Sequence, residues 1–286
     1  MVAMIYGMPT WLLAAIIVGG FAAFALMSHY LMRAFSRGRW RESSGTIGVV
    51  VTSTATLYAV LLAMIAVAAW GNYSETEARV REEANIAGNI YRDAEGLPAA
   101  ERDATRRMLR DYVTLVVDKE FPVMRQGGRP NATSDVVAAL MVRSLRFRPS
   151  NLGEANVQAR EFEEINRMFE LRRVRQETVR KGLLTVLWWV VIAGGLVTIL
   201  MTTLLITEDD WLSYLLCAGM AVMIGMMVFL IVAVDRPLMG AVSVDSTAFR
   251  QVEERMNTLD DTLQRIGPML NGSIDATSSG SATSAP

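Results

Sequence analysis

The chain has 286 residues, of which 52% are hydrophobic and 20% are charged, and its formal net charge is −1. This composition is too apolar for an ordinary soluble domain, and the near-neutral charge gives no support to a nucleic-acid partner. The apolar residues are concentrated in blocks, which predicts an all-α polytopic membrane protein with four transmembrane helices and a helical extramembrane domain.

The first two apolar blocks predict two membrane spans. Neither residues 1–32 nor residues 43–74 contain a charged residue, and a helix of about 20 apolar residues crosses a hydrocarbon core of roughly 30 Å. We therefore expect the first span at residues 11–32 and the second at residues 46–70. The first block is longer than the apolar region of a signal peptide and no cleavage site follows it, so we expect it to remain as a membrane helix.

Residues 71–182 form a polar block rich in helix-forming residues, which we assign to the helical extramembrane domain. Ser74 and Glu77 have the S-x-x-E spacing that caps the start of a helix, so the sequence predicts a new helix just after the second span. From Val80 to Ala94 its apolar side chains repeat at steps of three and four residues, which indicates one apolar stripe on a polar helix.

Three more helices are predicted in this block. One begins at Pro98, because the fixed φ of proline suits the first helical position, and another covers residues 134–146. Asn151 and Glu154 have the spacing of a capping pair and predict the start of a third, long helix. The apolar side chains expected on one side of that helix are Phe162, Ile165 and Phe169.

Two further apolar blocks predict the third span at residues 183–207 and the fourth at residues 211–234. The acidic turn Glu208–Asp210 separates them. Trp188, Trp189 and Trp211 lie towards the ends of these spans, where amphipathic rings favour the membrane–water interface.

Residues 235–267 form the expected amphipathic region after the last span, with a helix that begins near Ser246 and ends at Gly267–Pro268. From Phe249 to Ile266 its apolar residues alternate at steps of three and four residues. Such a seam packs on a partner helix, either within the chain or across subunits. Residues 268–286 are rich in serine, threonine, glycine and alanine, and we expect a disordered tail.

The distribution of basic residues predicts the orientation in the membrane. Four arginines lie between the first two spans: Arg33, Arg37, Arg39 and Arg41. Nine basic residues flank the spans on the other side: Arg79, Arg81, Arg172, Arg173, Arg175, Arg180, Lys181, Arg236 and Arg250. Because basic residues concentrate on the cytoplasmic side, the larger group favours a cytoplasmic central domain and two cytoplasmic termini.

No motif of an enzyme is present in the sequence. A Walker loop, a GxGxxG motif, an HExxH motif and a nucleophile elbow are all absent, so we expect no catalytic residues, no cofactor and no metal site. The carboxylates of the central helices stand beside arginines at helical spacing, which is typical of a solvated face. The spans contain no Asp, Glu, Lys or Arg, which argues against ion-coupled transport but permits a passive pore.

The second span is rich in hydroxyl groups. Five of seven consecutive residues carry one: Thr52, Ser53, Thr54, Thr56 and Tyr58. Hydroxyls can line an aqueous pore, but they also make hydrogen bonds between membrane helices. Composition alone leaves these two interpretations equally open.

Several stretches are similar to the bestrophin-like family, a mostly bacterial group of membrane proteins named for a distant similarity to bestrophin chloride channels. In the second span and the helix after it they are Leu57–Ala63, Trp70, Asn72–Tyr73 and Glu82–Asn85. Further along they are Arg92, Leu97–Pro98, Glu120–Pro122 and Val234–Gly240. The resemblance covers roughly residues 5–255. It implies a protein of the bacterial inner membrane.

The resemblance also implies a role for the second span, which lines a pentameric pore in bestrophins. Leu57–Tyr58 takes the place of an aromatic pair near the middle of that pore, and Trp70 with Asn72 takes the place of its polar exit. Counting back by helical turns puts Ser53 and Val49 at the other constrictions. Pore-lining positions are therefore expected at Val49, Ser53, Thr56 and Leu57.

Two other parts of the chain take their expected roles from the resemblance. The domain after the second span is cytosolic in bestrophins, so Arg79 and Arg81 would lie at the cytoplasmic mouth and favour anions. The segment with Asp235, Arg236, Pro237 and Gly240 resembles the one before the bestrophin calcium clasp. The acidic run that binds calcium is missing, so no calcium site is expected.

These observations lead to two hypotheses of different classes. The first is a homo-oligomer, a pentamer by resemblance, that embeds in the lipid bilayer and conducts small anions passively through a pore lined by the second span. The alternative is a non-conducting membrane scaffold or sensor whose helical domain binds partner proteins.

Overall fold

The computed structural model describes residues 6–35, 44–179, 181–205 and 211–280, and every regular element within them is helical. The chain divides into two compact units. The first unit comprises Met1–Glu77, Met124–Arg129 and Glu177–Val244. The second unit comprises Ala78–Val123, Pro130–Gln176 and Asp245–Pro286. The expected all-α class is confirmed.

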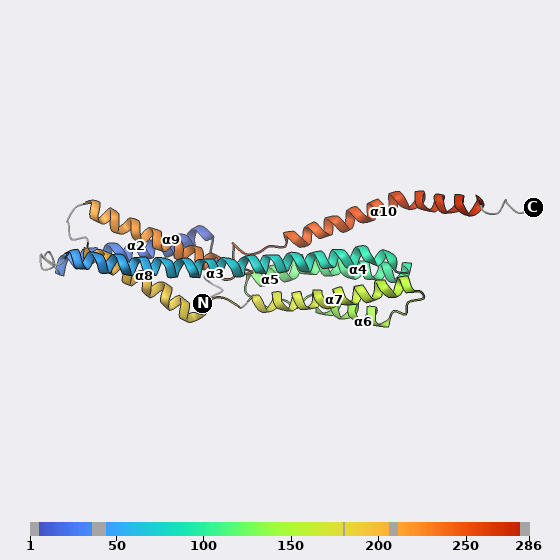
Figure 1. Cartoon of the computed structure of the whole chain (residues 1–286), viewed down its shortest axis with the longest axis horizontal. Helices are drawn as coiled ribbons and strands as arrows, with labels where there is room; N and C mark the ends of the chain where they lie inside the picture. Colours follow the sequence, from blue (N-terminus) through green and yellow to red (C-terminus); the bar gives the residue numbers. More distant parts are fainter. Residues whose placement is uncertain (1–5, 36–43, 180, 206–210, 281–286) are drawn as a thin grey trace, which may run out of the picture. The chain divides into compact units, whose positions relative to one another are not determined.

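The first unit contains four helices that are long and apolar enough to cross a membrane. They are α2 (Thr10–Phe35), the first part of α3 (Ser44–Asp93), α8 (Thr185–Leu205) and α9 (Trp211–Asp235). α2 packs against both α8 and α9, and all three lie beside α3 (Figure 1). The predicted number of membrane-spanning helices is therefore confirmed, while residues 37–41 of the basic loop and the acidic turn at 208–210 lie outside the described residues.

Small residues allow these helices to approach one another closely. A methyl group added at Gly225 of α9 would lie 2.9 Å from Cα of Val18 in α2, and one added at Gly194 of α8 would lie 2.6 Å from the ring of Tyr58. The Tyr58 hydroxyl donates a hydrogen bond of 2.8 Å to the carbonyl oxygen of Val191. Helix–helix packing in membranes depends on such small residues and polar contacts.

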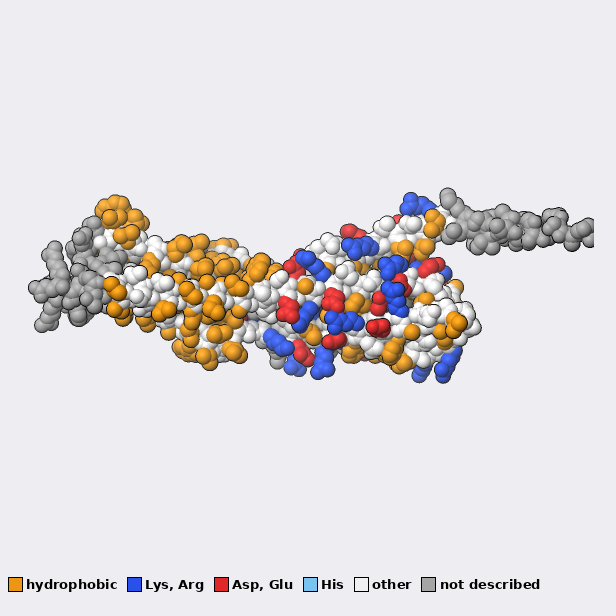
Figure 2. Space-filling model, viewed as in Figure 1, with side chains coloured by type: hydrophobic (Ala, Val, Ile, Leu, Met, Phe, Trp, Pro, Cys, Tyr) orange, Lys and Arg blue, Asp and Glu red, His pale blue; other side chains and the backbone are white. Residues whose placement is uncertain are grey.

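The outer surface of the first unit is apolar, as Figure 2 shows, whereas acidic and basic side chains gather on the surface of the second unit. Four tryptophans near the ends of the apolar helices are more than half exposed: Trp11, Trp70, Trp189 and Trp211. Apolar exposure of this extent suits lipid contact, and the exposed rings suit the membrane–water interface.

The second unit is a helical bundle. Its elements are the second part of α3, α4 (Ala99–Leu115), a π turn (Val116–Glu120), the start of α5 (Phe121–Arg125), α6 (Ser134–Arg146), α7 (Leu152–Thr178) and α10 (Thr247–Gly280). Figure 1 shows α4, α6 and α7 running along this part of α3. The fully buried large side chains at its centre include Tyr91, Leu109, Tyr112, Leu140, Ile165, Met168 and Phe249.

One predicted helix has the predicted bounds, and another begins where it was predicted to begin. α6 covers Ser134–Arg146 as expected. α7 begins after Asn151, whose side-chain oxygen accepts a hydrogen bond of 2.9 Å from the amide of Glu154. The Glu154 carboxylate accepts one of 2.7 Å from the amide of Ser150. This reciprocal arrangement satisfies amides that the first turn of a helix leaves without partners.

The predicted helix start at Ser74 is wrong, because α3 continues unbroken from Ser44 to Asp93. Ser74 is exposed, and the hydroxyl of Thr76 donates to the carbonyl oxygen of Asn72 one turn earlier, inside the helix. The buried positions Ala69, Thr76 and Val80 keep helical spacing through this segment, so packing favours continuation. The capping pattern has no function within a continuous helix.

The first apolar stripe packs within the chain, and the second does so over its first half, since Leu259 and Leu263 are half-buried and Ile266 is 38% exposed. All five residues of the stripe from Val80 to Ala94 are buried: Val80, Ala84, Ala87 and Tyr91 of α3, and Ala94 in the 3₁₀ turn after it. In α10, Phe249, Val252 and Met256 are buried, and Phe249 contacts the rings of Tyr112 and Phe121. α10 also continues beyond Gly267–Pro268 to Gly280. Because the chain itself covers the buried parts of the two stripes, these parts give no separate argument that the protein forms oligomers.

The predicted apolar face of α7 is only partly correct. Ile165 is fully buried, but Phe162 and Phe169 are exposed. The buried side of α7 instead continues from Ile165 through Met168 to Arg172 and Arg175. Arg172 and Arg175 therefore lie on the buried side of α7, although a prediction from the apolar residues alone would place such charged side chains in solvent.

Candidate functional site

The part of α3 in the first unit has one packed side and one bare side. Its packed side is formed by Val51, Tyr58, Leu62, Ile65 and Ala69, which are buried against the other apolar helices. The predicted pore-lining residues Val49, Ser53, Thr56 and Leu57 all lie on the other side, where Val49 is 67% exposed and Leu57 is 73% exposed.

The bare side continues along the helix as an apolar stripe. Val60, Met64 and Val67 follow Leu57 at helical spacing and are all more than half exposed. The hydroxyl of Thr56 donates to the carbonyl oxygen of Thr52 at 2.8 Å, so its oxygen keeps the capacity to accept a hydrogen bond. We call the residues Val49, Ser53, Thr56, Leu57, Val60, Met64 and Val67 the α3 stripe.

The hydroxyl-rich segment divides between both of its possible roles. Tyr58 makes a hydrogen bond to α8 on the packed side, while Ser53 and Thr56 are exposed on the α3 stripe. Leu57 and Tyr58 take the place of the bestrophin aromatic pair, and only Leu57 lies on the bare side of α3. Tyr58 holds the helices together.

The residues expected near the pore exit are accessible. Trp70 is exposed and stacks on Tyr73, with ring centroids 5.8 Å apart and planes inclined by 19°. Asn72 and Arg81 are exposed, and Arg79 is half-buried.

The segment after the fourth span forms a structural junction within the first unit. Asp235 is buried, and its carboxylate accepts hydrogen bonds from the amide of Leu183 at 2.6 Å and from the hydroxyl of Tyr6 at 3.3 Å. The carbonyl oxygen of Pro237 accepts a hydrogen bond from the amide of Val244 at 2.6 Å. These contacts hold together the start of the chain, the entry to α8 and the end of α9.

Two further residues complete the junction. Gly240 has a φ of +80°, and its amide donates to the carbonyl oxygen of Arg125 at 3.2 Å. A side chain there would be strained, because L-residues rarely adopt this φ. Arg236 is half-buried, with a guanidinium nitrogen 3.8 Å from the sulfur of Met239. Among the described residues no group of three or more His, Cys, Asp or Glu is placed to hold a metal ion.

A buried charge network in the second unit escaped sequence reasoning. Arg175 donates to both oxygens of Glu83, at 2.8 and 3.0 Å, and to Glu120 at 2.8 Å. The Tyr112 hydroxyl donates a short hydrogen bond to Glu83. Thr133 donates to Glu120 at 2.8 Å and accepts from Arg172 at 2.6 Å.

The network contains two arginines and two carboxylates, so its formal charges balance. Burial alone would lower the pKa of Arg175, but the charges of Glu83 and Glu120 hold it above its usual range. Burial raises the pKa of Glu120, yet the charge of Arg175 and the hydrogen bonds from Thr133 hold it below its usual value. Burial and the charge of Glu83 raise the pKa of Tyr112, so its hydroxyl stays a donor.

One sequence signal could have revealed the network. Glu83 lies within the buried stripe of α3, between Val80 and Ala87, and Arg175 follows Met168 at a spacing of seven residues on α7. Charged residues in phase with an apolar stripe are candidates for burial in pairs. The interpretation of all carboxylates as a solvated face was wrong for these residues.

Comparison with known proteins agrees with this architecture. The bestrophin-like domain family matches residues 19–249. The crystal structure of a mutant bacterial bestrophin homolog from Klebsiella pneumoniae superposes with a TM-score of 0.63 at 9% sequence identity, covering 82% of this chain and 96% of that chain. At this identity the structural likeness concerns the fold. No curated protein matches the chain. The family match covers most of the sequence, and on this evidence the chain belongs to the bestrophin-like family.

Proposed function

We propose that the protein is a homo-oligomeric membrane channel in which copies of the α3 stripe surround a passive pore for small anions. The observation that carries the proposal is the bare side of α3: the rest of the chain packs against its opposite side and leaves Val49, Ser53, Thr56 and Leu57 uncovered. The family's relation to bestrophin anion channels supports the same function.

The side chains of the α3 stripe suit passive conduction. The stripe contains no ionisable residue, so nothing along it would bind an ion tightly or carry a proton. In a ring of subunits, Leu57 and Val49 would form apolar constrictions that close by dewetting, while Ser53 and Thr56 would offer hydroxyls between them. Arg79 and Arg81 near the mouth would favour anions electrostatically.

The proposal includes an assembly and an orientation. By resemblance to bestrophins the oligomer would have five subunits, with Trp70 and Asn72 at the pore exit. The spans would lie at residues 11–32, 46–70, 183–207 and 211–234 of a bacterial inner membrane, with the central domain in the cytoplasm. Arg172 and Arg175 are neutralised by buried carboxylates, but the other basic residues of the larger group still outnumber the four of the first loop.

An exposed aromatic surface on α7 favours a second candidate function, that of a scaffold or sensor. Phe162 and Phe169 stand on the exposed side of α7, seven residues and therefore about two turns apart. Exposed aromatic side chains of this kind are enriched at protein–protein contacts. A scaffold or sensor would use such a face to bind a partner protein and would not conduct ions.

Ion flux from liposomes distinguishes the two functions. Leu57→Ser should raise chloride flux several-fold, because a hydroxyl favours water within an apolar constriction. A control on another face of α3, Leu62→Ser, is unsuitable because Leu62 is buried against the other apolar helices. Leu216→Ser is the matched control: Leu216 is exposed on α9, where we expect lipid. If wild type and Leu57→Ser are both silent for chloride, nitrate and potassium, the scaffold function replaces the channel.

A further inference from the structure

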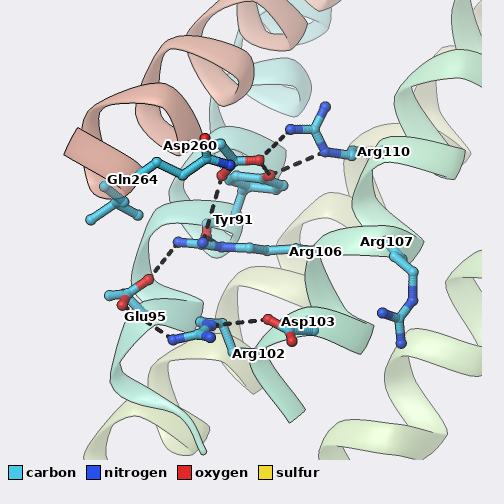
Figure 3. A pocket seen from close by; sticks show the side chains of 10 residues that line it. Tyr91, Glu95, Arg102, Asp103, Arg106, Arg107, Arg110, Asp260 and Gln264 are labelled. Atoms are coloured by element: carbon cyan, nitrogen blue, oxygen red, sulfur yellow. Dashed lines mark hydrogen bonds and ion pairs between the residues drawn. The ribbon is translucent and has the colours of Figure 1, made fainter. Parts of the chain in front are cut away.

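A groove on the second unit has no part in the proposed function. It has a volume of about 460 Å³ and lies between the C-terminal end of α3, the first half of α4 and α10 (Figure 3). Its size is within the range of small-molecule sites. The groove is lined mainly by charged groups, among them Arg102, Arg106 and Arg110 of α4.

The three arginines stand in a row. They are spaced four residues apart on one face of α4, so their Cα atoms rise by about 6 Å from one to the next along the helix. Arg106 donates from Nε to the carbonyl oxygen of Tyr91 at 3.2 Å, and its guanidinium lies 4.9 Å from the centre of the Tyr91 ring. Arg110 donates to the Tyr91 hydroxyl at 3.1 Å. The positions of these two guanidinium groups are therefore fixed without a ligand.

The inner end of the row is occupied by the protein itself. Asp260 of α10 accepts a hydrogen bond of 2.6 Å from Arg110 and one of 2.7 Å from the Tyr91 hydroxyl. Burial raises the pKa of Asp260, but these two hydrogen bonds and the nearby arginine charges hold it below its usual value. Asp260 therefore stays ionised and keeps Arg110 engaged. Asp260 also lies 3.6 Å from Nη1 of Arg106. A ligand would use Arg102 and the Nη2 nitrogen of Arg106, which contacts Glu95.

At the outer end, Asp103 accepts a hydrogen bond of 3.0 Å from Nε of Arg102, and a second carboxylate, that of Glu95, bridges Arg102 and Arg106. The Glu95 oxygens lie 2.9 Å from Nη2 of Arg106 and 3.4 Å from Nη1 of Arg102. The Glu95 side chain is 46% exposed and lies in the short 3₁₀ turn Ala94–Gly96. The pair of Glu95 with Arg102 is partly exposed and contributes little to stability, whereas the Arg106 side chain is only 13% exposed. A multivalent anion that contacts both guanidinium groups can displace the carboxylate. The position of Glu95 marks where the oxygens of such an anion would bind.

We propose that this groove binds a soluble anion with two or more linked phosphate groups, whose oxygens replace the Glu95 carboxylate between Arg102 and Arg106. Phosphate oxygens match the planar fork of a guanidinium group and bind it in pairs. An anion with several phosphates spans more than one arginine of the row, which a single phosphate does not. Arg107 adds a further positive charge at the rim, and it has no ion-pair partner among the described residues.

Tripolyphosphate is the probe for this site. Calorimetric titration of the full chain in nanodiscs of phosphatidylcholine, at constant ionic strength, should show saturable binding of one anion per chain. Arg102→Gln should weaken binding by about tenfold or more, because it removes a charge-assisted bidentate contact. Glu95→Gln should tighten it roughly three- to tenfold, because a neutral amide competes less well for the two arginines.

Two variants with the same changes of charge outside the groove serve as controls. Arg148→Gln and Glu170→Gln alter exposed residues that do not line it, and both should leave the affinity within about twofold of wild type, as expected for distant screened charges. Equal weakening by Arg148→Gln and Arg102→Gln would show unspecific attraction and overturn the proposal. So would a Glu95→Gln variant with unchanged affinity. Unfolding temperatures of all four variants identify any loss that comes from misfolding.

A lipid headgroup carries the same phosphate chemistry, and a separate arm distinguishes this source. Nanodiscs with diacylglycerol pyrophosphate, a lipid with two linked phosphate groups, and without soluble phosphate should not raise the unfolding temperature of wild type more than that of Arg102→Gln. A rise that depends on Arg102 would assign the site to lipid and overturn the soluble ligand. Binding is measured without ion flux, so its outcome is independent of whether the protein conducts.

Discussion

Arg175 is the residue on which the interior of the second unit depends most. It is buried and contacts both Glu83 and Glu120, which are also buried. Desolvating such groups is costly, and their mutual attraction compensates only while every partner is present. The pairing therefore makes the packing of α3, α7 and the π turn specific, because any other arrangement would leave a buried charge without its partner.

Removing this arginine should destabilise the protein strongly. Arg175→Met leaves the buried Glu83 without its guanidinium partner and leaves Glu120 only the more distant Arg172, at 3.6 Å, so we expect a loss of about 3–5 kcal/mol. Arg167→Met is the matched control, since Arg167 pairs with Glu82 and Glu170 at the surface and its loss should change stability little. Thermal unfolding in detergent measures both. Similar unfolding temperatures for the two variants would contradict the structural role of the network.

Glu161 provides a pH dependence at the same scale. Burial raises its pKa from 4.5 to about 7, against the hydrogen bond from Thr105. The folded chain thus binds this proton more tightly than the unfolded chain does, so the stabilisation is complete below pH 4.5 and is lost as the pH rises through 7. The shift corresponds to roughly 3 kcal/mol at higher pH.

A neutral isostere should remove this dependence. Glu161→Gln is expected to be more stable than wild type at pH 8 and to show a flatter profile of unfolding temperature between pH 5 and pH 8. Glu163→Gln on the exposed side of α7 should keep the wild-type profile. A profile for Glu161→Gln that parallels wild type would mean that another group titrates in this range.

At the scale of the element, the sequence was most informative where local chemistry decides the structure. The capping residues Asn151 and Glu154 predict the start of α7 because their hydrogen bonds form within one turn. The same kind of motif at Ser74 misled, because tertiary packing on both sides favours an unbroken α3. The face of α7 was predicted only in part: the phase of Arg175 with Met168 is a local signal, but the burial of Arg175 depends on Glu83 and Glu120, which are distant in sequence.

The candidate pore residues show the same division. Helical spacing alone places Val49, Ser53 and Leu57 on one side of α3, and the structure leaves that side uncovered. Which side would be covered depends on α8, whose contact with Tyr58 has no local signal in the second span. The groove between α3, α4 and α10 joins residues 91–110 with residues 260–264, which are distant in sequence, so no local pattern predicts it.

Substitutions at two glycines of α9 test how closely α2 packs against α9. Gly225→Ala would bring a methyl group to 2.9 Å from the Cα atom of Val18, and we expect a loss of about 1–3 kcal/mol because backbone cannot yield as a side chain does. Gly219→Ala on the same helix meets nothing within 4 Å, and should be neutral or slightly stabilising since alanine favours the helix. Equal effects on the unfolding temperature would contradict the close contact.

At the scale of the whole molecule, an assembly would use surfaces other than the stripe from Val80 to Ala94 and the first half of the stripe from Phe249 to Ile266, which the chain buries itself. We expect a homo-oligomer in mild detergent, with contacts through exposed apolar faces of the spans. Light scattering with the detergent mass subtracted measures its size. A monodisperse monomer would remove the pore, because one α3 stripe cannot enclose a channel.

The continuity of α3 makes its two halves share one rotational phase. Val80 and Ala87 in the second half follow Ala69 in the first half by about three and five full turns. The buried positions of both halves therefore fall on one face of the helix. Inserting one residue at Gly71 would turn the second half by about 100° relative to the first. Inserting seven would bring it back to within about 20° of its starting phase. The protein should therefore tolerate the insertion of seven residues at Gly71 better than the insertion of one.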